Sequence, residues 1–142
     1  MKKILITAAS ILMISSGCNQ KFTTSNLPTE FMEIGNGGGF TGSYTYYKVA
    51  KNGQVFFSQT GDSVYSNYGE IGKRIAKKAY KDLGKLRNEP SSQAGNLNFF
   101  IFRAEKDTMT SWLWSDDKKP SEGVLRIYKT LNEEVSKIKE TE

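Results

Sequence analysis

The chain has 142 residues, of which 37% are apolar and 25% charged, a composition that suits one globular domain. It contains no histidine and one cysteine, which excludes Ser-His-Asp and Cys-His catalysis and histidine zinc sites. The net charge of +5, or +3 without Lys2 and Lys3, is too mild for a nucleic-acid-binding domain. We therefore expect no metal ion, no cofactor and no nucleic-acid partner.

The first 17 residues have the pattern of a secretory signal peptide. Lys2 and Lys3 precede an apolar run at residues 4–14, and small residues follow at 15–17. As a helix this run would rise only about 16 Å, roughly half of a bilayer core, so it does not predict a transmembrane span. Without the leader, 18 basic residues stand against 15 acidic ones (20 minus Lys2 and Lys3), a net charge of +3.

The motif Ser15-Ser16-Gly17-Cys18 resembles the lipobox of bacterial lipoproteins, although Ser15 stands where leucine is commonest. The resemblance implies cleavage before Cys18 and attachment of several acyl chains to the new N-terminus. Each buried methylene contributes about 0.8 kcal/mol, so several chains form a lasting membrane anchor. In enteric lipoproteins aspartate at the next position marks retention in the inner membrane. Asn19 stands there, so we expect an envelope protein in the outer rather than the inner membrane.

The polar residues 18–29 predict a lipidated N-terminus followed by a flexible tether, and residues 30–142 predict a single domain. Asn52-Gly53 lies between two runs of β-forming residues, which is a strong signal for a hairpin. In chain order, the first expected elements are a strand at 31–34, a glycine-rich loop at 35–42, a strand at 43–50, a strand at 54–59 and a polar loop at 60–68.

The second half of the chain alternates between helical and strand periodicity. A helix is expected over residues 70–86 and another after Pro120, each with one apolar stripe. Between them, residues 97–104 and 108–114 predict a second hairpin. The two stripes consist of Ile71, Ile75, Ala79, Leu83 and Leu86 in the first helix, and Val124, Ile127, Tyr128, Leu131, Val135 and Ile138 in the second.

The order hairpin, helix, hairpin, helix predicts an α+β fold. We expect a two-layer sandwich in which two helices cover one face of an antiparallel sheet of about five strands. The runs at 44–47 and 99–102 carry aromatic or apolar side chains on both strand faces. Either these strands are central, or the uncovered face of the sheet carries an aromatic surface.

Gly37, Gly38 and Gly39 belong to the stretch from Gly35 to Gly42, which fits the letters Gly-X-Gly-X-X-Gly. A dinucleotide site needs a helix after such a loop, whereas here a strand is expected. The stretch is either a connection that needs positive φ or a backbone loop that grips a small ligand. Together with the tyrosine-rich strand and the Asn-Gly turn, it resembles small lipoproteins of Bacteroidota, a resemblance that implies no activity.

Two further groups are candidate binding residues. Trp112 and Trp114 share one strand face and are either core residues or an exposed platform for a sugar or a protein. The first helix is basic outside its apolar stripe. This face is either simply solvated or contacts anionic lipid, glycan or an acidic protein. Its candidate contact residues are Lys73, Arg74, Lys77 and Lys78.

The sequence therefore favours a membrane-anchored, non-enzymatic envelope lipoprotein that binds a protein or glycan partner, for example as an inhibitor, an immunity protein or a subunit of an envelope complex. The alternative is a small-ligand site, or an enzyme using carboxylate or lysine chemistry, at the Gly35 to Gly42 loop. The sequence shows no set of catalytic residues for such an enzyme.

Overall fold

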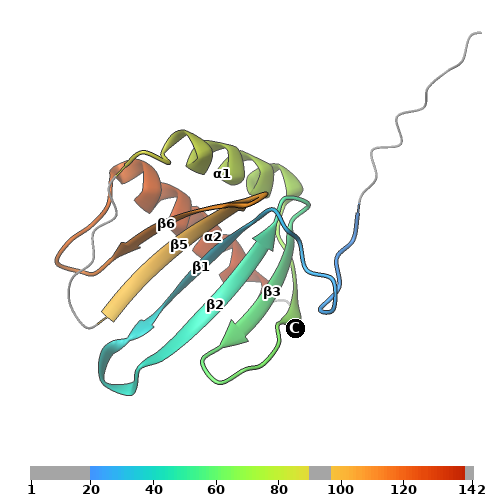
Figure 1. Ribbon diagram of the computed structural model, residues 1–142, viewed down its shortest axis with the longest axis horizontal. Coiled ribbons are helices and arrows are strands. Elements are labelled where there is room, and N and C mark those ends of the chain that lie inside the picture. Colours follow the sequence, from blue (N-terminus) through green and yellow to red (C-terminus); the bar gives the residue numbers. More distant parts are fainter. Residues whose placement is uncertain (1–19, 90–96, 140–142) are drawn as a thin grey trace, which may run out of the picture.

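A computed structural model describes residues 20–89 and 97–139 and shows an α+β fold, with a six-stranded antiparallel sheet and two α-helices (Figure 1). The predicted leader and Cys18 lie outside the described residues. The elements are β1 (Phe31–Gly38), the 3-10 turn η1 (Gly39–Thr41), β2 (Ser43–Ala50), β3 (Gln54–Gln59), β4 (Ser66–Glu70), α1 (Lys73–Lys85), β5 (Leu97–Glu105), β6 (Thr108–Trp114) and α2 (Glu122–Lys139).

The strands lie in the order β4-β3-β2-β1-β5-β6, so β1 is central and pairs with β2 and β5. Ile34 lies opposite Tyr47 of β2 and Ile101 of β5. Because successive side chains of a strand point to opposite faces, Ile34 contributes to one face of the sheet and its neighbour Glu33 to the other.

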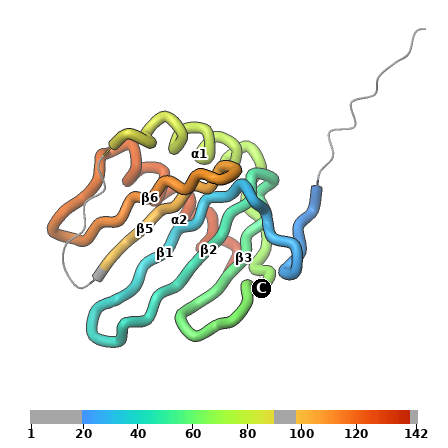
Figure 2. The backbone as a smooth tube through the Cα atoms, in the orientation of Figure 1, coloured from blue at the N-terminus to red at the C-terminus, as the bar shows by residue number. Residues whose placement is uncertain are grey.

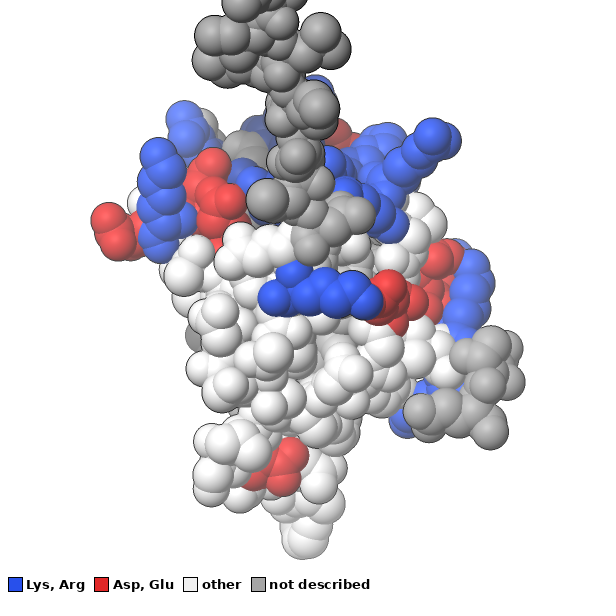
Figure 3. Space-filling model, turned by 90° about the vertical axis from the view of Figure 1, so that its right-hand side faces the viewer, with Lys and Arg blue, Asp and Glu red and all other residues white. Residues whose placement is uncertain are grey.

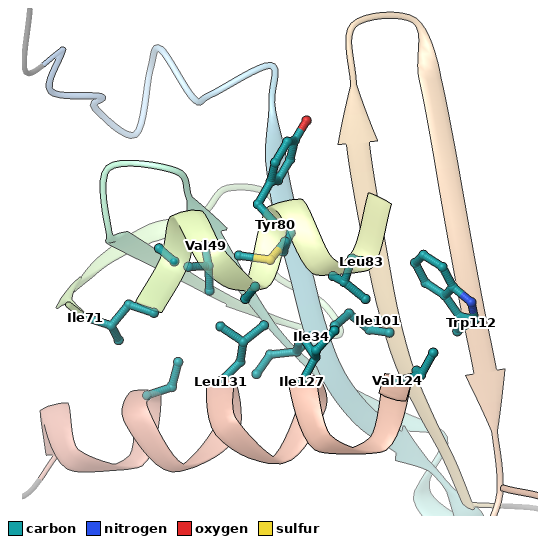
Figure 4. Close-up of a cluster of buried hydrophobic side chains, with 14 of the residues drawn as sticks. Ile34, Val49, Ile71, Tyr80, Leu83, Ile101, Trp112, Val124, Ile127 and Leu131 are labelled. Carbon is teal, nitrogen blue, oxygen red and sulfur yellow. The ribbon is translucent and has the colours of Figure 1, made fainter. Parts of the chain in front are cut away.

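One hydrophobic core joins the sheet to both helices (Figure 4). Ile34, Ile101 and Trp112 meet side chains from both helices, among them Leu83 of α1 and Leu131 of α2. The apolar periodicity of the sequence predicted the buried residues of α2 but, in α1, only Ala79 and Leu83; Ile75 and Leu86 are half-buried instead. The buried helix residues are Ala76, Ala79, Tyr80 and Leu83 in α1, and Val124, Ile127, Leu131 and Val135 in α2.

The sheet has six strands rather than about five because residues 66–70 form the edge strand β4. We expected a polar loop at 60–68 and a helix from residue 70, whereas α1 begins at Lys73. The sequence Ser-Asn-Tyr-Gly-Glu lacks apolar alternation; β4 pairs with β3 across a bulge and packs a single ring, Tyr68, against the core. Hydrophobic periodicity does not detect such a strand.

The predicted glycine-rich loop is wrong in its first half, because β1 continues through Gly35 to Gly38. A Cβ atom on Gly35 would lie 2.0 Å from the Thr45 carbonyl oxygen and 2.3 Å from the Phe100 ring. Glycine is needed here because the Thr45 carbonyl oxygen and the Phe100 ring occupy the space of a side chain, not because the backbone turns.

The predicted hairpin at Asn52-Gly53 is confirmed. In the two-residue turn that Asn-Gly favours, both residues have a positive φ angle, whereas here only one does. Gly53 has φ 98°, whereas Asn52 does not have a positive φ. A Cβ on Gly53 would lie 2.4 Å from the Ile71 carbonyl oxygen, so glycine also admits the chain that enters α1.

Residues 20–29, expected to be a flexible tether, lie against the domain. The Phe22 backbone N–H donates to Gln54 Oε1 at 2.7 Å, and Gln54 Nε2 donates to the Phe22 carbonyl at 3.1 Å. Asn52 Nδ2 donates to the Gln20 carbonyl at 2.7 Å, and Pro28 is buried. Composition alone did not predict these bonds because their partners lie about thirty residues further along the chain. Within the described ranges, no helix is both long and apolar enough to cross a membrane.

Candidate functional site

The sheet face that carries Glu33 bears a row of aromatic rings. The ring centroids of Tyr46 and Phe100 are 5.4 Å apart, and those of Phe100 and Phe102 are 4.9 Å apart and stacked. Tyr44 extends the row, 6.2 Å from Tyr46. Phe100 is buried, whereas the other three side chains are half-buried. The two strands expected to carry apolar side chains on both faces do so, and their rings pack over the glycines of β1.

An ion pair lies on the same face, which we call the clasp (Glu33, Lys48, Tyr65). Lys48 Nζ is 3.6 Å from Glu33 Oε2, with side chains only 12% and 10% exposed. The Lys48 ammonium lies 4.4 Å from the centre of the Tyr65 ring, and the Tyr65 hydroxyl donates to the Glu33 carboxylate. Burial, together with this hydrogen bond to a carboxylate, raises the pKa of Tyr65 above its usual range.

The clasp is best explained as a structural device. Its buried charges neutralise one another, and the carboxylate accepts a hydrogen bond as well. Tyr65 stands at the end of the β3–β4 connection, whereas Glu33 is in the central strand. The clasp therefore fastens this connection across two strands of the sheet.

The end of the sheet at which β1 finishes carries two exposed apolar side chains. We call it the apolar tip and define it as η1, which contains Phe40, together with the β3–β4 connection, which contains Val64. Phe40 is fully exposed and Val64 is 71% exposed. The two connections lie side by side, because the Tyr44 backbone N–H donates to Thr60 Oγ1 at 2.7 Å and the Thr60 N–H donates to the Tyr44 carbonyl at 2.9 Å. Figure 2 shows both at the lower end of the molecule, away from α1.

Charge is almost absent from the apolar tip. The sequence has no charged residue between Glu33 and Lys48 and a single one, Asp62, between β3 and β4. A carboxylate oxygen of Asp62 accepts a hydrogen bond from the Gln59 backbone N–H at 2.9 Å, which holds it within its own turn. The lower part of the side shown in Figure 3 is accordingly mostly uncharged.

The opposite end, which we call the basic end, is dominated by the exposed face of α1, and Lys and Arg gather there in Figure 3. Asp82 is the only acidic residue of the helix and accepts hydrogen bonds from both Lys78 and Lys85. These two bonds lower the pKa of Asp82. All the basic side chains of the helix are exposed: Lys73, Arg74, Lys77, Lys78, Lys81 and Lys85.

A cleft of about 380 Å³ opens at the basic end, between the N-terminal segment, the β2–β3 turn and the first turns of α1. Lys51, Lys73 and Lys77 line it, and Lys51 forms an ion pair with Glu30 at 2.8 Å. Gln20 also lines the cleft. The structure thus brings two of the predicted helix residues together with a lysine from the β2–β3 turn.

Tyr80 and Arg103 fix α1 to the sheet below its basic face. The Tyr80 hydroxyl donates to the Ala104 carbonyl at 2.8 Å, and Arg103 Nε donates to the Tyr80 carbonyl at 2.8 Å. The guanidinium also lies 4.0 Å from the centre of the Tyr80 ring. Burial raises the pKa of Tyr80 to about 12. These contacts make the basic face a rigid surface.

Of the two interpretations of Trp112 and Trp114, core residues are confirmed and an exposed platform is wrong. Trp112 is fully buried and Trp114 is 3% exposed, because both point from the edge strand β6 into the core. Gly37 and Gly38 are strand residues, and Gly39 begins η1. Neither the clasp nor the apolar tip was predicted from the sequence. A charged residue between two buried apolar ones, as in Met32-Glu33-Ile34, was the available signal for the clasp.

No family model and no curated protein matches this chain. In residues 20–89 and 97–139, no group of three or more acidic, histidine or cysteine side chains is placed to hold a metal ion.

Proposed function

We propose that this chain is the precursor of a bacterial lipoprotein, anchored in the envelope through a lipid on Cys18, whose domain binds a protein partner through the apolar tip and is not an enzyme. The leader and the lipobox-like motif support the anchor. The placement of the outer rather than the inner membrane follows from Asn19 and belongs to the same proposal.

The proposal includes the arrangement of layers. We infer that α1 and α2 form one layer on a single face of the sheet, as in a two-layer sandwich. Side chains from both helices and from alternate strand positions form one buried cluster, which supports this arrangement. The other face then keeps the aromatic row and the clasp, which hold the two connections of the apolar tip in place.

The observation that carries the proposal is the complete exposure of Phe40 in a surface with a single charged residue, Asp62. Burying a phenylalanine side chain is worth about 1.5–3 kcal/mol, so a partner with an apolar pocket gains affinity from it. Aromatic anchors of this kind dominate protein interfaces. A protein fits better than a glycan, because Phe40 and Val64 offer no hydrogen-bonding group to sugar hydroxyls.

The alternative of a small-ligand or enzyme site at Gly35 to Gly42 has less support. A Cβ on Gly35 would meet Phe100, and one on Gly37 would lie 2.5 Å from Tyr44 Cα, so this half of the stretch is closely packed. The nearest lysine and carboxylate, Lys48 and Glu33, neutralise each other within the clasp.

Photocrosslinking in the native envelope tests the partner. The photoreactive residue p-benzoylphenylalanine replaces Phe40 in one variant and Lys129, an exposed residue of α2, in a matched control. We expect a discrete protein adduct from position 40 and none from position 129. Equal adduct patterns from the two positions, or none from position 40, would overturn binding at the apolar tip.

Metabolic labelling with a fatty acid tests the anchor. We expect label on the wild-type protein and none on Cys18→Ser, with wild type in the outer-membrane fraction. Label on both proteins, or on neither, would refute lipidation at Cys18.

A further inference from the structure

The structure fixes how much chain separates the proposed anchor from the domain. Gln20 is hydrogen-bonded to Asn52, and Phe22 is bonded twice to Gln54. Only Asn19 stands between Cys18 and Gln20, and two residues of extended chain reach at most about 7 Å. A bilayer that holds Cys18 therefore lies directly against the end of the domain where Gln20 is bound.

That end is the basic end. Gln20 lines the same cleft as Lys73 and Lys77 of α1. Lys21 is 4.0 Å from Glu70, at the end of β4 from which the chain enters α1. The apolar tip lies at the other end of β1, whose eight residues span about 25 Å.

The charges of α1 are arranged unfavourably for an isolated helix. Lys73, Lys77, Lys81 and Lys85 follow one another at intervals of four residues, and like charges at this spacing destabilise a helix. Cations also stand in the first turn, where the helix dipole is positive, with no acidic residue and no side-chain cap. An anionic surface against this face would remove both penalties.

We infer that the basic face of α1, made of Lys73, Arg74, Lys77 and Lys81, lies against the phosphate groups of an anionic membrane and points the apolar tip away from the bilayer. The inference rests on the proposed lipid anchor. It commits to a membrane rather than an acidic protein, because the anchor brings a lipid surface within about 7 Å of Gln20.

The test uses the lipidated protein extracted from cells and reconstituted into vesicles. A fluorescent donor is placed on Lys81→Cys at the basic face, Lys129→Cys on α2 or Val64→Cys at the tip, and an acceptor is attached to lipid headgroups. On phosphatidylcholine–phosphatidylglycerol vesicles we expect energy transfer to be strongest from position 81 and weakest from position 64. On phosphatidylcholine alone, or in high salt, the difference should shrink to what the short link to Cys18 alone imposes.

Charge reversal tests which basic residues contact the membrane. Arg74→Glu with Lys77→Glu should shift the equilibrium away from the surface-bound orientation by at least about 25-fold, about fivefold for each charge removed. The matched control, Lys129→Glu with Lys139→Glu on α2, makes the same change in net charge and should leave the transfer unaltered. Circular dichroism of each variant establishes that it is folded.

The outcomes separate the two proposals. Equal transfer from the three positions, or equal effects of the two charge reversals, would overturn the orientation while the lipid on Cys18 stands. An intact mass of the extracted protein that shows a bare thiol at Cys18 would overturn both the anchor and the inference. An acidic protein as the ligand of α1 is excluded if the purified lipoprotein gives the expected pattern on vesicles alone.

Discussion

The two ends of the sheet differ in what their side chains can do. At the basic end, a helix fixed by Tyr80 and Arg103 presents a row of cations on a rigid surface. At the apolar tip, two connections present Phe40 and Val64 with one charge between them. Long-range attraction to a charged surface suits the first, and close apolar contact suits the second.

The two proposed binding surfaces lie at opposite ends of one strand. β1 begins next to the N-terminal segment and ends at η1, so its length sets the distance between the two surfaces. The clasp and the aromatic row lie between them and hold the tip in place without contributing an exposed surface of their own. Variants that affect one end and spare the other therefore test most directly whether the apolar tip and the basic end have separate roles.

The largest expected contrast is between Trp112→Ala and Phe40→Ala. Trp112 is fully buried in the core, so its truncation should lower the free energy of unfolding by about 3–5 kcal/mol. Phe40 is fully exposed, so its truncation should change that free energy by less than about 0.5 kcal/mol. Urea denaturation measures both. A Phe40→Ala variant as unstable as Trp112→Ala would show that the tip is structural.

The next largest difference between the apolar tip and the basic end is expected from Glu33→Gln. It leaves the buried ammonium of Lys48 without its counter-ion, and breaking a buried pair costs about 3–5 kcal/mol. We expect faster amide hydrogen exchange in residues 60–65 and unchanged exchange in α1. Tyr65→Phe, which removes only the hydrogen bond, should cost about 1 kcal/mol and loosen the same connection. Uniformly faster exchange over both ends would contradict a local role for the clasp.

Alkaline pH should weaken the attachment of α1. The folded protein holds the pKa of Tyr80 at about 12, above its unfolded value of about 10. The folded state therefore binds more protons between these values, and stability present below pH 10 is lost as pH rises through 12. Unfolding followed against pH should be less steep in Tyr80→Phe than in wild type. Identical profiles would mean that Tyr80 titrates normally.

The sequence predicted the regular elements with strong local signals. The strands β2, β3 and β6 have the expected bounds, and α2 buries most of its expected stripe. In α1 only Ala79 and Leu83 of the expected stripe are buried, together with Ala76 and Tyr80, which were not expected. What was missed depends on partners distant in sequence. The need for glycine at position 35 comes from the Phe100 ring, and β4 is defined by its pairing with β3. The local periodicity of the sequence gives no information on the ring contact at Gly35 or on the pairing of β4 with β3.

The candidate surfaces were predicted unevenly for a related reason. The basic face of α1 followed from composition and helical spacing, because exposed positions of a helix are set by its apolar stripe. Trp112 and Trp114 were placed on one face correctly, but which face the helices cover is a property of the assembled sheet. Phe40 was overlooked because an aromatic residue among glycines gives no sign of its burial.

The smallest expected effect concerns Asp82, the only acidic residue of α1. Asp82→Asn removes two exposed ion pairs, so it should lower stability by at most about 1 kcal/mol. Because the folded state lowers the pKa of Asp82, this contribution is present above the unfolded value of about 4 and disappears as pH falls below it. Wild type and variant should therefore differ in thermal midpoint at neutral pH and converge in acid.

The same substitution, Asp82→Asn, frees Lys78 and Lys85 and should strengthen energy transfer from position 81 to anionic vesicles. A variant that is less stable yet no closer to the headgroups would show that the charge of α1 serves the helix alone.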